Sequence, residues 1–210
     1  MIEAPLQVAL LSPYHGGSHA AWGDGLARHS RHTVEIHSLP ARFWKWRMHG
    51  AALTFADRLA DRAAPDVLIA TDMLDLSTFL GAMRRSWVDV PAVLYMHENQ
   101  VTYPLPEDGD TGPMRRQAGE RDRHYGFINL ASMAVADRIL FNSEYHRAAL
   151  FDALPAFLRH FPEERGLDRI DRLSEKSSVI PVGIEVDDLP AIGATPRPPL
   201  VVWNQRWEYD

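Results

Sequence analysis

Apolar and amphipathic stretches alternate along most of the chain. Five short apolar runs recur, at residues 6–12, 65–71, 91–96, 138–142 and 178–181. Runs of this kind, without alternation of polar and apolar positions, are typical of strands buried on both faces of a parallel sheet. Residues 33–39 alternate instead, which predicts a strand nearer an edge of the sheet.

Helical patterns fill the intervals between these runs. We expect helices at residues 18–29, 42–63, 75–86, 120–137, 144–151 and 155–176. Ser18, Asp75 and either Asn142 or Ser143 are expected to cap three of them. The repeated alternation of strand and helix predicts an α/β fold: a Rossmann-like parallel sheet with right-handed crossovers and helices on both faces.

Four polar residues interrupt the pattern where the fourth strand should end. His97, Glu98, Asn99 and Gln100 follow the apolar run 91–96 directly. In open α/β sheets, ligands bind in the crevice beyond the carboxyl ends of the strands. An imidazole, a carboxylate and two carboxamides in succession are a dense set of polar groups for an ordinary surface loop, which is the alternative interpretation. These four residues are therefore the first candidate site.

A glycine pair marks the end of the first predicted strand. Gly16 and Gly17 allow a tight turn or a close approach of the backbone to a ligand, and a helix start after them suits phosphate or sugar hydroxyls. The spacing is not the G-x-G-x-x-G of dinucleotide-binding folds, and a tight turn without a ligand remains the alternative. His15 and His19 lie four residues apart, but no third ligand at a recognisable spacing supports a metal site.

Aromatic and basic residues are interleaved at the predicted start of the second helix. The segment 42–47 reads RFWKWR, in which Phe43, Trp44 and Trp46 stand beside three basic side chains. Aromatic rings beside arginines can stack on bases or sugars while the charges meet phosphates. They can equally belong to an amphipathic helix, with the rings in the core and the charged groups reaching solvent. Both interpretations stay open.

Residues 104–118 form the longest stretch without a periodic pattern, and they begin just after the polar cluster. Long loops are uncommon in compact domains unless they are functional or disordered. We therefore expect a lid or an acceptor-recognition loop. Arg121 and Tyr125 share a face of the helix that follows, whose polar first turns are expected to face the same crevice as His97.

The end of the chain changes in composition. Residues 1–185 are expected to form one domain, and residues 186–199 have the proline-rich composition of a linker. Residues 200–210 begin with a strand pattern and leave no room for a helix, so they are expected to open a second, truncated domain.

Composition narrows the classes of function. The chain has 210 residues, a formal net charge of -6 and no cysteine, which excludes disulfides, thiolate metal sites and a thiol nucleophile. There is no signal segment, and no apolar run approaches the roughly 18 residues of a membrane span, so we expect a soluble, cytoplasmic protein without a membrane partner. The negative charge argues against a chain built mainly to coat nucleic acid, although local basic patches are compatible with it.

Seven motifs in order resemble the amino-terminal half of the tRNA-queuosine mannosyltransferases and their bacterial relatives: LSPYHGGSH, LPARFWKWR, YMHENQVTYP, RDRHYGFIN, LFNSEYHR, VIPVGIE and NQRWEYD. These enzymes are family-four retaining glycosyltransferases with the two-domain GT-B fold. The resemblance covers nearly the whole chain, and HENQ-x-x-YP together with PA-x-x-W-x-W-R is its most specific part.

The resemblance implies a reaction. Mannose, or a related hexose, would pass from a nucleotide sugar, GDP-mannose first, to a cyclopentenediol hydroxyl of queuosine in a tRNA anticodon, with retention of configuration. The first domain would mainly bind the acceptor, a C-terminal domain would bind the donor, and no metal or other cofactor is expected. Because the remaining donor-binding residues would lie beyond Asp210, we expect little or no turnover from this chain by itself.

The resemblance also implies roles for individual residues. His97 is expected at the reaction centre with Glu98, and Arg206 is expected to neutralise the donor pyrophosphate, as suits a leaving group that gains negative charge. Gly16, Gly17 and Ser18 would approach the donor phosphate or the transferred sugar. The residues expected to bind the acceptor are His19, Trp44, Trp46, Arg47, Asn99, Gln100, Tyr103, Arg121 and Tyr125.

Two other classes of function compete with this interpretation. A nucleotide-dependent oxidoreductase or epimerase would use the same fold, but it predicts the glycine fingerprint that is missing here. A non-catalytic module that binds tRNA or a sugar requires no donor-binding half.

Overall fold

Six parallel strands form one sheet in the computed structural model, which describes residues 4–103, 113–163, 165–186 and 193. The strands are β1 (Gln7–His15), β2 (Thr33–Pro40), β3 (Val67–Thr71), β4 (Ala92–Met96), β5 (Arg138–Phe141) and β6 (Ser177–Val179). Their order in the sheet is β2-β1-β3-β4-β5-β6, and every neighbouring pair is parallel. This confirms the predicted Rossmann-like α/β architecture.

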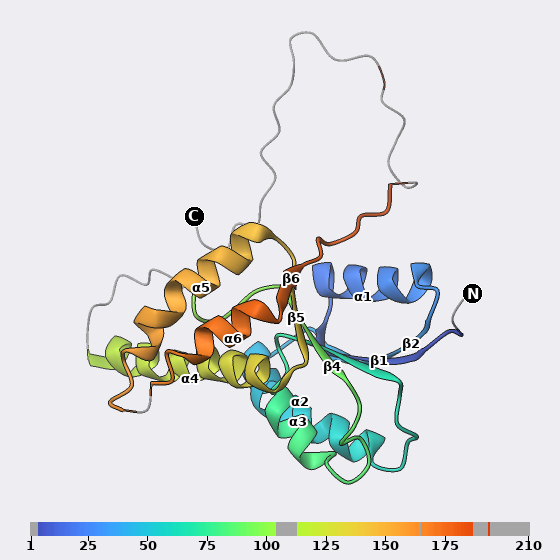
Figure 1. The fold of residues 1–210 in the computed structure, drawn as a ribbon, viewed down its shortest axis with the longest axis horizontal. Coiled ribbons are helices and arrows are strands. Elements are labelled where there is room, and N and C mark those ends of the chain that lie inside the picture. Colours follow the sequence, from blue (N-terminus) through green and yellow to red (C-terminus); the bar gives the residue numbers. More distant parts are fainter. Residues whose placement is uncertain (1–3, 104–112, 164, 187–192, 194–210) are drawn as a thin grey trace.

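Helices alternate with the strands along the chain. They are α1 (Gly17–His29), α2 (Trp44–Leu59), α3 (Leu76–Ala82), α4 (Pro113–Val135), α5 (Glu144–Leu158) and α6 (Arg169–Glu175). Figure 1 shows α1 on one side of the sheet and α2 and α3 on the other, so both faces are covered.

The strand order reverses between β1 and β3. The chain passes from β1 to its neighbour β2 on one side, and then returns across β1 to add β3 and the later strands on the other side. Helices that leave β1 and β3 therefore run on opposite faces, and a crevice opens between them at the carboxyl ends of these strands. This switch point is where the fold itself predicts a ligand.

The central strands are buried, as their apolar runs predict. Leu10 in β1, Leu68 in β3, Leu94 in β4 and Ile139 in β5 are each fully buried in the core. Strand β2 pairs only with β1 and has several exposed positions, which confirms its predicted place at an edge.

Several predicted boundaries are wrong. Helix α4 begins at Pro113 instead of residue 120, so residues 113–118 of the predicted loop are helical. Proline is favoured at the first helical position, because its missing N–H has no partner there in any case. The predicted helix 155–176 is interrupted: α5 ends at Leu158, α6 begins at Arg169, and Gly166 between them has a positive φ of 60°.

Other predictions at the chain's loops and end stay untested. Residues 104–112 lie outside the described part of the chain. So do residues 200–210 and, apart from residues 186 and 193, the predicted linker. In the parts that the structure does describe, there is no helix of the length and apolarity that crossing a membrane requires.

Two of the three predicted helix caps are confirmed. The Asp75 carboxylate accepts a hydrogen bond from the Thr78 N–H at 2.9 Å, and the Ser143 hydroxyl accepts one from the His146 N–H at 3.1 Å. Ser18 does not cap α1, because the helix starts at Gly17 and no side-chain cap is made there.

Replacement of Asp75 by alanine is expected to destabilise the fold by about 1 kcal/mol, the usual cost of losing an N-cap side chain. Asp75 also accepts hydrogen bonds from the Ser77 and Thr78 hydroxyls, at 2.6 and 2.7 Å. Asp168 precedes α6 without a side-chain cap bond, so Asp168→Ala is the matched control and should change little. Urea unfolding of both variants measures the difference, and equal losses would contradict the assignment.

Candidate functional site

Three buried polar side chains gather at the switch point. His19 comes from the first turns of α1, Asp72 follows β3 and His97 follows β4. Asp72 is 1% exposed and His19 is 8% exposed. One polar atom from each of the three lies within 4.8 Å of the others. Parallel strands end at the same edge of a sheet, so residues far apart in the sequence meet here.

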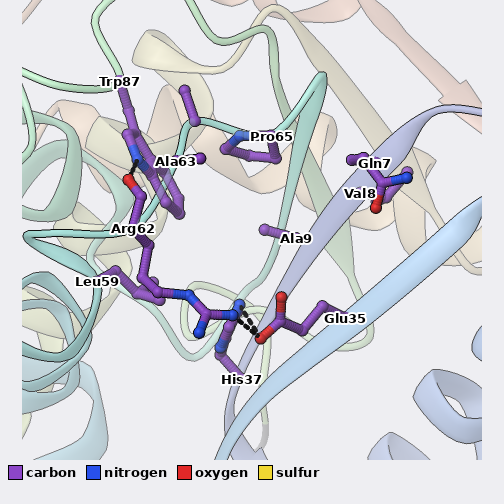
Figure 2. Close-up of a pocket in the computed structure, with 11 residues that line it drawn as sticks. Gln7, Val8, Ala9, Glu35, His37, Leu59, Arg62, Ala63, Pro65 and Trp87 are labelled. Atoms are coloured by element: carbon purple, nitrogen blue, oxygen red, sulfur yellow. Dashed lines mark hydrogen bonds and ion pairs between the residues drawn. The ribbon is translucent and has the colours of Figure 1, made fainter.

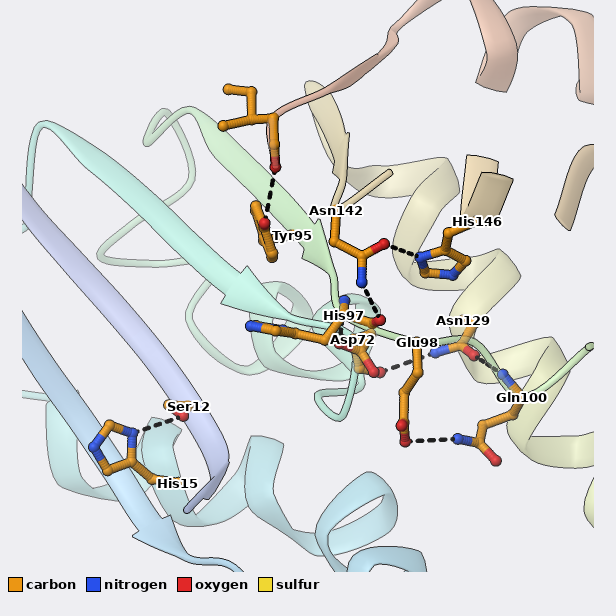
Figure 3. A network of polar contacts seen from close by, with 11 residues as sticks. Ser12, His15, Asp72, Tyr95, His97, Glu98, Gln100, Asn129, Asn142 and His146 are labelled. Atoms are coloured by element: carbon orange, nitrogen blue, oxygen red, sulfur yellow. Dashed lines mark hydrogen bonds and ion pairs between the residues drawn. The ribbon is translucent and has the colours of Figure 1, made fainter. Parts of the chain in front are cut away.

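His97 is fixed from several sides. Its backbone N–H donates to the Asp72 carboxylate at 2.9 Å, and its carbonyl accepts from the Asn142 side chain at 2.7 Å. Figure 3 shows both contacts at the strand ends. The imidazole stacks on that of His19, with ring centroids 4.2 Å apart, and meets the ring of Trp22 edge-on at 4.8 Å. His97 is thus held in one orientation without any ligand.

Burial and charge shift two of these groups. Burial lowers the pKa of His19, and the neighbouring Asp72 carboxylate raises it in part. For Asp72, burial acts to raise the pKa, but the contacts with His97 and the charge of His19 outweigh it and leave the pKa below its ordinary value. Asp72 is therefore a carboxylate at neutral pH, and His19 tends to be uncharged.

The remaining residues of the polar cluster are tied to one another. The Asn99 side chain accepts from the N–H groups of Val101 and Thr102, at 3.0 and 2.8 Å, which is a typical asparagine turn. Gln100 donates to the Glu98 carboxylate at 3.4 Å. Asn99 is 3% exposed, so its main contribution is to the shape of the turn.

Asn129 was missed by the sequence analysis. Its amide donates to the Asp72 carbonyl at 2.9 Å and accepts from the Gln100 N–H at 2.8 Å (Figure 3). It lies in the apolar half of α4, where one polar residue at a core position is the signal that could have found it. One side chain thus joins the end of β3 to the turn after β4.

A cavity of about 360 Å³ opens beside His97. Its walls come from the polar cluster, Tyr103 and the start of α5. His146 lines it and bonds the Asn142 side chain at 3.0 Å (Figure 3), and burial lowers the pKa of this histidine. The sequence predicts that either Asn142 or Ser143 caps α5, and in the structure Asn142 also donates to the His97 carbonyl.

The glycine turn has structural reasons of its own. A Cβ at Gly16 would collide with the Cβ of Ala41, and Gly17 has a φ of 52°, a conformation that other residues avoid. Ser18 is exposed at the start of α1. His15 turns away to Ser12 (3.1 Å) and Asp24 (3.3 Å), so it does not pair with His19 at a metal site.

The aromatic segment at the start of α2 divides into a partly buried residue, Trp44, and an exposed part. Trp44 packs against Tyr125 of α4, with ring centroids 5.1 Å apart, beside a small apolar cluster that contains Met73. Trp46 is 66% exposed and Phe43 is 73% exposed, so these two rings face solvent. The interpretation as a packed amphipathic helix therefore applies to Trp44, and the exposed rings of Phe43 and Trp46 are free of that packing.

Of the three predicted arginines, the structure describes the side chain of Arg47 only. The Arg47 guanidinium donates to the Pro40 carbonyl at 3.3 Å, next to the glycine turn. Arg206 and the side chain of Arg121 lie outside the described part of the structure.

A second cavity, of about 280 Å³, lies at the opposite end of the strands (Figure 2). It is bounded by the start of β1, the Glu35–Arg62 ion pair and the buried ring of Trp87. None of the candidate residues reaches it, and in this class of fold ligands bind at the carboxyl ends instead. We assign this cavity no part in the site.

The three buried groups at the switch point have the composition of a cation site, but not its geometry. A metal ion bound by two imidazoles needs their in-plane lone pairs to converge on one point. The rings of His19 and His97 stack nearly parallel, with an interplanar angle of 28°, so these lone pairs run side by side. The Asp72 carboxylate is already engaged by the His97 N–H. We therefore treat the cluster as a hydrogen-bonding site.

The comparisons with known proteins agree with the motifs. The family model described as tRNA-queuosine alpha-mannosyltransferase N-terminal matches residues 7–184. The tRNA-queuosine alpha-mannosyltransferase of Drosophila melanogaster is 28% identical over 214 residues, covering 97% of this chain and 54% of the relative. The chain thus spans about half the length of this relative. Since the match takes in every strand of the sheet and all the described candidate residues, the chain belongs to the tRNA-queuosine alpha-mannosyltransferase N-terminal family.

Proposed function

We propose that this chain is the acceptor-side half of a retaining glycosyltransferase, which moves mannose or a related hexose from a GDP sugar to queuosine in a tRNA anticodon. The observation that carries the proposal is the pre-ordered polar site around His97, inside the segment matched by the family. The transfer reaction would take place in the cytoplasm. Turnover would require a donor-binding half in addition to this chain.

His97 and Glu98 are the proposed catalytic residues. A rigidly held imidazole just after β4 can bind the sugar hydroxyls close to the reacting carbon, and orientation of this kind lowers the barrier to transfer. Glu98 follows it on the same turn and lines the cavity beside it, where a carboxylate can accept hydrogen bonds from an acceptor diol.

The donor is proposed to enter at the glycine turn. The turn between β1 and α1 leaves the first N–H groups of α1 near Gly17 and Ser18, and such groups favour a phosphate. Arg206 is proposed to neutralise the pyrophosphate from the other side of the cleft. The choice of GDP-mannose over other nucleotide sugars rests on the family, and competition between GDP and UDP for the bound donor would test it.

The exposed part of the aromatic segment is the proposed contact with the anticodon loop. Phe43 has a left-handed backbone, with a φ of 54°, although it is not a glycine. This conformation costs about 1 kcal/mol or more, and the exposed ring gains no packing in return. Arg42 lies by this ring, 5.9 Å from its centroid. A flat ring beside a cation suits stacking on an unpaired base.

Replacement of Trp46 or Phe43 by alanine is expected to weaken tRNA binding about tenfold, since a base stacked on an aromatic side chain contributes about 1–3 kcal/mol. Val88→Ala is the control, because it also shortens an exposed apolar side chain (71% exposed) but lies outside this segment. Fluorescence anisotropy with a queuosine-containing anticodon stem-loop measures the affinity. Equal affinities of all variants would remove this segment from the acceptor site.

A further inference from the structure

Asp72 has no role in the proposed reaction so far, yet it is among the most buried polar residues described. It is 1% exposed, and its Oδ1 accepts the backbone N–H of His97 at 2.9 Å. The same oxygen lies 3.4 Å from the His97 Nδ1, within ion-pair distance but not aligned as a hydrogen bond. The Asp72 carbonyl accepts from Asn129. Asp72 is therefore the residue through which β3 and α4 hold His97.

A buried carboxylate is costly unless a cation or several donors compensate it. In the described part of the chain, the imidazoles of His97 and His19 lower the pKa of Asp72, and Asp72 in turn raises the pKa of His146. One protonated ring beside one carboxylate makes the cluster neutral. Two protonated rings, stacked with centroids 4.2 Å apart, would place like charges in contact inside the protein.

Some nitrogens of these rings are left without partners. His19 Nδ1 and both ring nitrogens of His97 are buried and make no hydrogen bond. Unpaired buried polar atoms are rare, and each calls for an explanation. The hydroxyl groups of a bound ligand, which both donate and accept hydrogen bonds, would satisfy them.

We propose that Asp72, His97 and His19 act as one unit, in which Asp72 positions His97 and a charge on one of the two stacked imidazoles disfavours a charge on the other. The use of this unit in glycosyl transfer rests on the proposed function above, but its protonation does not. Asp72 is a positioning residue in this scheme, because it acts through His97. His19 is then part of the reaction centre, in addition to its expected place beside the acceptor.

Other titratable groups face the unit from the elements packed around it. His15 at the end of β1 acts on His19, and His146 of α5 is acted on by Asp72 and His97. Tyr95 of β4 contacts the His97 ring, and burial raises its pKa to about 12, so it stays neutral. Asp72 therefore supplies the negative charge of the unit.

Ring-nitrogen NMR of this chain, followed from low to high pH, tests the proposal without donor or tRNA. In Asp72→Asn, which can still accept the His97 N–H, the titration midpoint of His19 should move to lower pH because the carboxylate that raises its pKa is gone. In His97→Ala, the same midpoint should move to higher pH because the like charge is gone. Shifts of opposite sign are the expected result.

Asp137→Asn is the matched control, because Asp137 also accepts a strand N–H, that of Ala92 at 2.7 Å, but at the other end of β4. It should leave the His19 midpoint unchanged. No shift in either variant, or two shifts of the same sign, would overturn the proposal. So would a stoichiometric change of both ring signals on addition of Zn²⁺ alone, which would make the cluster a metal site.

If Asp72→Asn does not fold, the His97→Ala titration still decides whether the His97 ring acts on the protonation of His19. Once the donor-binding half is present, Asp72→Asn is expected to lower kcat with little change in KM and to alter the pH profile of kcat. Opposite NMR shifts without any glycosyl transfer would keep the unit and reject the proposed function. Glycosyl transfer without the NMR shifts would reject the unit and keep the proposed function.

Discussion

Replacement of His97 by alanine is expected to lower the rate of glycosyl transfer about a hundredfold or more, the usual effect of removing an oriented catalytic group. His97 is placed by Asp72, Asn142 and the stacked ring of His19, so no neighbouring side chain is free to take its position. Steady-state transfer to queuosine-containing tRNA measures the effect in a protein that joins this chain to the proposed donor-binding half.

His160→Ala is the matched control for this substitution. His160 is an exposed histidine just after α5, and its ring contacts only the Ala156 carbonyl, at 3.0 Å, among the described residues. It should transfer sugar at the wild-type rate. Thermal unfolding should show that His97→Ala remains folded. Transfer that survives in folded His97→Ala would mean that the reaction centre lies elsewhere.

Replacement of Asn129 by alanine is expected to destabilise the fold by about 3 kcal/mol and to slow transfer at temperatures where the variant is still folded. The substitution leaves the Asp72 carbonyl and the Gln100 N–H without their buried partner, and each such loss costs about 1–3 kcal/mol. It also frees the turn that carries Glu98 and Asn99. Chemical unfolding and transfer assays measure the two effects.

Ser132→Ala is the comparison that separates stability from function. Ser132 lies on the same helix and is also fully buried, and it joins the Leu76 N–H (3.0 Å) and the Leu74 carbonyl (3.1 Å). Its loss should destabilise α4 against the turn after β3 but leave His97 in place. If both variants slowed transfer equally, loss of stability would explain the effect and Asn129 would have no role in the site.

The strands and the polar cluster were predictable because they depend on local pattern. Buried parallel strands need uninterrupted apolar runs, and the run ending at Met96 is followed at once by His97. The position of Asp72 directly after β3 can also be seen in the sequence, but its contact with His97 cannot. His19, Asp72 and His97 meet because β1 lies between β2 and β3, and the order of strands is a property of the whole sheet.

The errors have physical reasons too. The start of α4 at Pro113 was missed because the hydrophobic pattern becomes periodic only later, while the proline alone marks the first turn. The predicted helix over residues 155–176 is broken between Leu158 and Arg169, in a stretch that contains Gly166 with a positive φ, which no helix contains. Trp44 and Trp46 could not be told apart by sequence, since only the position of α4 decides which ring is buried.

The proposed activity of this fold, transfer of a sugar to queuosine in tRNA, can be measured directly. The direct measurement is mass spectrometry of nucleosides from queuosine-containing tRNA, incubated with GDP-mannose and a protein that joins this chain to the proposed donor-binding half. We expect a hexose on queuosine with the wild-type protein and none with His97→Ala. Unmodified queuosine with the wild-type protein and every GDP and UDP sugar would contradict the account.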